Sequence, residues 1–77
     1  MRLPVVSGKE LLKFFSKHEF KVIRQRGSHI SVYKKTEKGH CIVVIPDKKE
    51  VNKKTLRSII RQAKLTREEF LELWERR

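Results

Sequence analysis

The sequence is poor in the residues that cross-link small proteins or interrupt their elements: 77 residues include one cysteine, three glycines and two prolines. Cys41 cannot form an internal disulfide, and the apolar residues 42–44 beside it predict a buried thiol. Together with His29 and His40 it lacks the ligand spacing of a metal centre, so we expect neither metal nor cofactor. No apolar run approaches the ~20 residues of a membrane span, and residues 1–7 lack the apolar core of a secretory signal. These absences favour a cytoplasmic protein.

Acidic residues are also scarce. Nine Asp and Glu face twenty Lys and Arg, giving a net charge of +11. Residues 48–64 hold seven of these cations and a single acid, Glu50, whereas residues 65–77 reverse the sign. Lysine-rich surfaces also serve solubility alone, but an excess this large in so short a chain favours a polyanionic partner, a nucleic acid or a membrane surface. Residues 1–77 are expected to form one domain with one modest core.

Helical and strand-like patterns follow one another along the chain. Ser7 and Glu10 form a capping-box pattern, which predicts a helix over residues 8–18. The period then changes to two, and short β-branched runs predict strands over residues 20–25, 30–35 and 41–45. Turns at 26–28 and 36–40, each with a glycine, would join them as antiparallel hairpins.

Asn52 is a plausible N-cap for a helix over residues 53–63. Its apolar face recurs at helical spacing: Leu56, Ile59, Ile60 and Ala63. A basic ridge occupies another side: Lys53, Lys54, Arg57, Arg61 and Lys64. Thr66 opens a third helix, in which Phe70, Leu73 and Trp74 form either core or a partner surface; a domain this small favours core.

This order predicts an α+β fold, a three-stranded antiparallel sheet with helices packed on one face. The α-β-β-β-α order, here with an additional C-terminal helix, is also that of double-stranded-RNA-binding domains, which read A-form shape through phosphates and 2′-hydroxyls. Lys53, Lys54, Arg57 and Arg61 would then contact RNA phosphates.

Four segments carry a closer resemblance, in order: residues 7–11, 24–29, 44–46 and 53–63. The specific part is the turn Gly27-Ser28-His29 combined with Thr55-Leu56-Arg57-Ser58-Ile59 and Gln62-Ala63. In these motifs the chain resembles the HicA (YcfA-like) toxin family. The resemblance implies a double-stranded-RNA-binding-like fold, a metal-independent mRNA interferase (an endoribonuclease) of a type II toxin–antitoxin system, and a HicB-like antitoxin. It places the family's essential histidine at His29.

The residue chemistry is compatible with that role. RNA carries its own nucleophile, the 2′-hydroxyl, and an imidazole near neutral pH can accept that proton or protonate the departing 5′-oxygen. Arg24, Arg26 and the helix lysines could stabilise charge on the pentacoordinate phosphate. One histidine serves one of the two proton transfers, so we expect a slow enzyme. His40 is a candidate for the other, or a surface residue.

Gly27 and Ser28 support His29 in this reading; Ser28 either orients the imidazole, binds phosphate, or only closes the turn. The chain departs from the family at two positions. Ile30 replaces a frequent second histidine, and Lys64 replaces a glycine that often ends the second helix.

Two other functions compete with RNA cleavage. The same fold could grip double-stranded or structured RNA without cutting it, or serve as a DNA-binding regulator, although no helix-turn-helix spacing is evident. The expected partners are an mRNA substrate and an acidic HicB-like antitoxin covering His29, with no membrane. The free protein is expected to be a monomer or a weak dimer.

Overall fold

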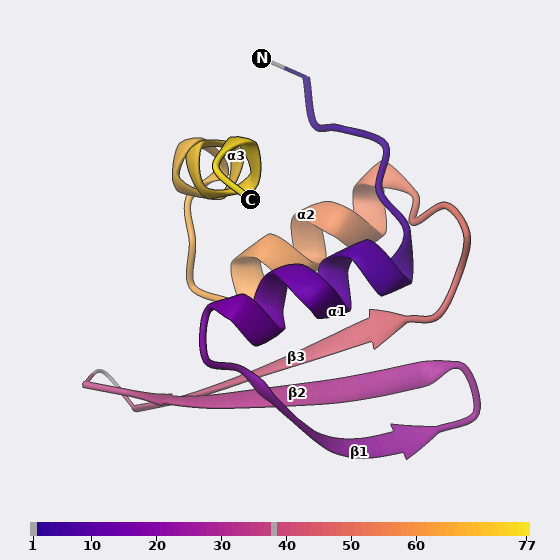
Figure 1. The fold of residues 1–77 in the computed structure, drawn as a ribbon, viewed down its shortest axis with the longest axis vertical. Helices are drawn as coiled ribbons and strands as arrows, with labels where there is room; N and C mark the ends of the chain where they lie inside the picture. The colour runs from indigo at the N-terminus through magenta and orange to yellow at the C-terminus, as the bar shows by residue number, and fades with distance from the viewer. Residues whose placement is uncertain (1, 38) are drawn as a thin grey trace.

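Three helices and three strands follow one another in a computed structural model that describes residues 2–37 and 39–77 (Figure 1). They are α1 (Gly8–Lys17), β1 (Lys21–Arg26), β2 (His29–Thr36), β3 (Gly39–Pro46), α2 (Lys53–Gln62) and α3 (Arg67–Glu75). The strands form one antiparallel sheet in the order β1-β2-β3. The expected α+β class, element order and sheet are confirmed.

Local sequence signals begin each helix. Ser7 and Thr66 close capping boxes with Glu10 and Glu69, and the Asn52 side chain accepts a hydrogen bond from the amide of Thr55 at 2.8 Å. These contacts satisfy amide groups that the first turn of a helix leaves without partners. The three predicted helix starts are therefore confirmed.

The hydrophobic core lies between the helices and one face of the sheet (Figure 1). β2 and β3 contribute alternate residues to it: Ile30, Val32, Cys41, Val43 and Ile45. The predicted apolar face of α2 is buried, and Phe70 and Trp74 of α3 pack against Phe14, with ring centroids 5.3 Å apart in both pairs. These two aromatic residues are core, as expected, while Leu73 is only partly buried.

The strands run closer to their turns than the sequence predicted. Thr36 pairs with Gly39, so His40 lies in β3 rather than in a turn over 36–40, and the prediction of that long turn was wrong. Part of the predicted turn, Lys38, lies outside the described residues. A hairpin ladder continues as long as backbone groups can pair, whatever the polarity of the side chains, which is why composition alone placed this strand end badly.

Lys64 ends α2 without the expected glycine. Its φ is +60°, in the left-handed region that glycine favours after a helix. The amide of Leu65 still donates to the carbonyl of Ile60 at 3.1 Å, which closes the helix end. The helix therefore ends where a glycine would have ended it. Holding the Lys64 side chain in the left-handed region costs ~1 kcal/mol.

Candidate active site

The turn that carries His29 is fixed at both ends. Gly27 has φ +59°, a left-handed conformation that disfavours a side chain, although open space surrounds the position of its missing Cβ. The carbonyl of Ser28 accepts a hydrogen bond from the amide of Asp47 at 2.6 Å, which ties the turn to the end of β3. His29 follows as the first residue of β2, paired with Arg26 and Pro46.

His29 opens onto a cleft of about 250 Å³ between the strand ends and α2. The turn between β1 and β2, the end of β3 and the start of α2 all lie at one end of the molecule (Figure 1). The lining combines an imidazole, an ammonium, two amides and a hydroxyl with a few apolar groups: His29, Lys48, Asn52, Gln62, Thr55, Val44, Pro46 and Val51. Cation and proton-transfer group thus share one concave surface.

Backbone hydrogen bonds hold the segment that brings Lys48 to this cleft. The Lys48 carbonyl accepts from the amide of Gly8 at 2.8 Å, and the amide of Val51 donates to Val6 at 2.8 Å. Gly8 must be a glycine, because a Cβ there would lie 3.0 Å from the Cα of Asp47 and closer still to the carbonyl oxygen of Pro46. The N-terminal segment therefore clamps residues 46–51 in place.

Gln62 ties α2 to the edge of the sheet. Its Oε1 accepts a hydrogen bond from the backbone amide of Val44 at 2.9 Å, across 18 residues of sequence. The bond satisfies an edge amide of β3, and it places the far wall of the cleft relative to His29. Gln62 belongs to the Gln-Ala motif noted in the sequence, and this contact gives that motif a structural role.

Sequence reasoning missed four polar members of the cleft as site residues: Lys48, Asn52, Thr55 and Gln62. The sequence pattern indicates only a capping role for Asn52, and it presents Lys48 only as part of a basic segment. The spacing of Thr55 and Gln62, seven residues apart on one helix stripe, was the available signal that both face the same side.

Arg24 and Arg26 share the sheet face of His29 because β1 contains a bulge. The register shifts between Val22 and Arg24, so that Arg24 pairs with Ser31 and Arg26 with His29. Without that extra residue, Ile23 would pair with Ser31 and Arg24 would point toward the core face. Directly paired residues point to the same side of a sheet. The bulge therefore directs both guanidinium groups to the face on which His29 lies.

The basic residues of α2 are separated from His29. Arg57 and Arg61 line a different cleft of about 270 Å³, together with Leu3, Ile60, Leu65 and Arg67. Lys53 lies one turn before Arg57, and Lys54 two turns before Arg61, so the predicted basic ridge runs along the flank of α2 away from Thr55 and Gln62. The structure brings Arg24, Arg26 and His29 together but not these four.

His40 lies far from His29. It pairs with Lys35, six residues along β2 from His29 and hence about 20 Å away at the usual rise of a strand. Its ring stacks on Tyr33, and the Tyr33 hydroxyl is hydrogen-bonded to its Nδ1. A proton transfer at the same phosphate needs contact distance, so His40 does not complete a pair with His29.

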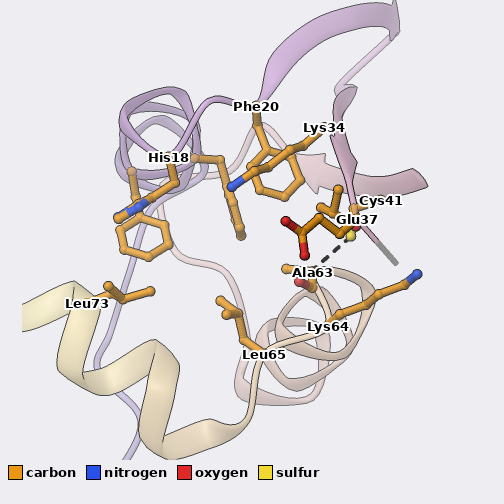
Figure 2. A pocket seen from close by; sticks show the side chains of 12 residues that line it. His18, Phe20, Lys34, Glu37, Cys41, Ala63, Lys64, Leu65 and Leu73 are labelled. Atoms are coloured by element: carbon orange, nitrogen blue, oxygen red, sulfur yellow. Dashed lines mark hydrogen bonds between the residues drawn. The ribbon is translucent and has the colours of Figure 1, made fainter. Parts of the chain in front are cut away.

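An apolar pocket of about 370 Å³ lies toward the other end of the sheet, beside Thr36 and Cys41; Figure 2 shows it from close by. Phe20, Cys41, Leu65 and Leu73 line it, with Lys34 and Glu37 among its polar groups. It contains none of the predicted site residues. Within residues 2–37 and 39–77, no group of three or more His, Cys, Asp or Glu side chains is arranged to hold a metal ion. None of the described helices has the length and apolarity to span a membrane.

Comparison with known protein families identifies the class to which this fold and site belong. The family described as the HicA toxin of bacterial toxin–antitoxin systems matches residues 8–65, from the start of α1 to the residue before the cap of α3. The chain therefore belongs to the HicA toxin family, and the resemblance noted in its sequence is confirmed. Membership implies a toxin–antitoxin partner. Neither a curated protein nor a solved structure matches the chain.

Proposed function

We propose that this toxin is an endoribonuclease that cleaves mRNA, with His29 as its general acid or base and without a metal cofactor. The observation that carries the proposal is the cleft in which His29 and Lys48 lie together, beside an amide and a hydroxyl from α2. Family membership supports the toxin role. A concave site that combines an imidazole with a cation suits reactions at a phosphodiester.

The reaction uses the substrate's own nucleophile. The 2′-oxygen attacks the adjacent phosphorus and loses its proton, the bond from phosphorus to the 5′-oxygen breaks, and that oxygen gains a proton. His29 performs one of these transfers, and solvent supplies the other, since His40 is out of reach. Lys48 and Arg26 stabilise the added negative charge on the phosphate. Because solvent performs one of the two proton transfers, the enzyme is slow.

Binding extends beyond the cleft. Arg24 and Arg26 hold phosphates next to His29, and Lys53, Lys54, Arg57 and Arg61 provide a second cationic surface on the other flank of α2. Gly27 and Ser28 hold the turn in shape. The toxin acts in the cytoplasm, where mRNA is found. A HicB-like antitoxin with an acidic surface neutralises it by covering His29.

The competing function is a module that binds structured RNA without cutting it. The observation in its favour is the cationic flank of α2, which lies apart from the cleft that His29 lines. Such a module would need Arg57 and Arg61 for affinity and would not depend on His29.

A cleavage assay with purified protein separates the two functions. His29→Ala and His29→Gln should abolish cutting of an mRNA transcript in the presence of EDTA, and should relieve growth arrest when the variants are expressed. His18→Gln is the matched control, because that imidazole packs at a tilt against Phe14 in the helical layer and should be dispensable for cutting. Undiminished cutting by both His29 variants would refute the proposal. RNA bound but never cut by the unmodified chain would favour the binding module.

A further inference from the structure

The sheet has an outer face that the helices leave open. Paired residues define rows across it, beginning at the His29 end: Arg26, His29 and Pro46; then Arg24, Ser31 and Val44; then Lys21, Tyr33 and Ile42; then Lys35 and His40. Ile42 is 52% exposed and Val44 37% exposed, although both lie in the middle of a strand. These two side chains form a short apolar strip that no helix covers.

The charge of this face has one sign. The three strands contain no aspartate or glutamate. On this face Lys21, Arg24 and Arg26 lie along β1, across β2 from the apolar strip, and Lys35 lies beside His40. An open β-sheet without any carboxylate is suited to a polyanion that crosses it.

An aromatic pair lies on this surface toward the end away from His29. The rings of Tyr33 and His40 have centroids 5.4 Å apart and planes inclined by 27°, and the hydrogen bond between them holds both in place. His40 is exposed and Tyr33 half-buried. Rings fixed in advance lose little conformational freedom when a flat ligand stacks on them.

We propose that single-stranded RNA lies along this outer face, with unpaired bases stacked on Tyr33 and His40 and phosphates held by Lys21, Arg24 and Lys35. The proposal rests on the proposed ribonuclease function and specifies its substrate. Tyr33 lies four residues along β2 from His29, a distance of about 13 Å, or roughly four nucleotides at the ~3.4 Å spacing of stacked bases. Bases a few nucleotides from the cleavage site are therefore bound by stacking on Tyr33 and His40.

A duplex does not fit this surface equally well. Its bases are stacked on one another and offer no free ring face, and proteins that bind double-stranded RNA contact its backbone instead. Aromatic rings among cations on an open sheet are typical of single-strand recognition. The inference therefore favours unpaired mRNA over the structured RNA that the α-β-β-β-α order alone suggested.

Binding measurements on the full chain carrying His29→Ala, which prevents cutting, test the proposal. The probes are a fluorescent ten-nucleotide single strand and the same sequence in a duplex. Adding Tyr33→Leu should weaken single-strand binding roughly 5- to 100-fold, the range for one lost base-stacking contact. Tyr33→Phe keeps the ring and should remain within about threefold of its parent.

A second pair of variants tests the role of charge. Lys35→Ala should lower the salt dependence of single-strand binding by about one phosphate contact, a change of ~0.7 in the log–log slope. Lys13→Ala removes an exposed lysine from α1, in the helical layer, and should leave the slope unchanged.

The inference is overturned if Tyr33→Leu binds the single strand as tightly as Tyr33→Phe, if the duplex competes better than the single strand, or if Lys13→Ala has the effect expected of Lys35→Ala. It is also overturned if Tyr33→Leu abolishes antitoxin binding but leaves RNA binding intact, since the face is then a protein surface. Cutting by the unmodified chain is scored separately. If Tyr33→Leu cuts RNA as well as its parent does, base stacking on Tyr33 is refuted and the ribonuclease function is not. If RNA binds through Tyr33 but is never cut, the ribonuclease function is refuted and base stacking is not.

Discussion

Replacing Gly8 with alanine tests how the cleft wall is held. Gly8 is the first residue of α1, and its missing side chain is what allows residues 46–48 to approach the helix. An added Cβ would overlap the carbonyl oxygen of Pro46, and it would lie 3.0 Å from the Cα of Asp47 and 3.1 Å from the amide nitrogen of Lys48. All three are backbone atoms, so no flexible side chain can move aside.

The expected loss of stability follows from three contributions. Overpacking of a close contact costs about 1–3 kcal/mol, and displacing Lys48 also loses its 2.8 Å hydrogen bond with the Gly8 amide, about 1 kcal/mol. Alanine also restricts the unfolded chain more than glycine does, which stabilises the folded protein by about 0.4–1 kcal/mol. The net loss is about 1–3.5 kcal/mol, which for a domain of this size lowers the melting temperature by roughly 5–25 °C.

Thermal unfolding followed by circular dichroism measures this loss. Lys9→Ala changes the next, exposed residue of the same helix turn and should shift stability by less than about 0.5 kcal/mol. At a temperature where Gly8→Ala remains folded, its RNA cleavage should still fall, because Lys48 has moved relative to His29. A Gly8→Ala protein that melts within about 3 °C of its parent would show that residues 46–48 do not lie against α1 as described.

Three further substitutions test other parts of the fold. Gln62→Leu should cost about 1 kcal/mol in denaturant unfolding through loss of the hydrogen bond to the Val44 amide, and Gln62→Glu, which keeps an acceptor, should recover most of it; equal losses would show that the contact contributes nothing. Lys64→Gly should raise the melting temperature or leave it unchanged, since it removes a side chain from the left-handed region, and a clear decrease would contradict that conformation. Phe70→Ala should cost about 3–5 kcal/mol, enough to unfold much of the protein, because the ring is fully buried against Phe14; a cooperative melt near that of the parent would place α3 outside the core.

Features set by neighbouring residues were predictable from the sequence. Ser7 and Glu10, three residues apart, are enough to begin α1, and the buried face of α2 follows from the spacing of Leu56, Ile59 and Ile60. Such signals act within one or two turns of a helix, so neither the rest of the fold nor its partners can change them. The same holds for Gly27, whose turn lies between two adjacent strands.

Features that depend on distant contacts were not predictable. The bond between Gln62 and Val44 spans 18 residues, and the approach of Gly8 to residues 46–48 spans still more. Nothing local to Lys48 distinguishes it from the other lysines of its segment, yet the clamp places it in the cleft. Helical spacing correctly predicted that the basic residues of α2 share one side of the helix. Whether that side faces His29 depends on how the helix packs on the sheet.

The chemical groups at the ends of the cut RNA test most directly whether this toxin is a ribonuclease that uses His29 and the 2′-hydroxyl of its substrate. If the 2′-hydroxyl is the nucleophile and His29 moves a proton for it, a transcript cut by the purified toxin in EDTA carries a 2′,3′-cyclic phosphate on one fragment and a 5′-hydroxyl on the other. Mass spectrometry of the fragments identifies both ends, and His29→Ala should yield neither. Fragments ending in a 3′-hydroxyl and a 5′-phosphate would mean that water attacked the phosphorus, and would contradict the account.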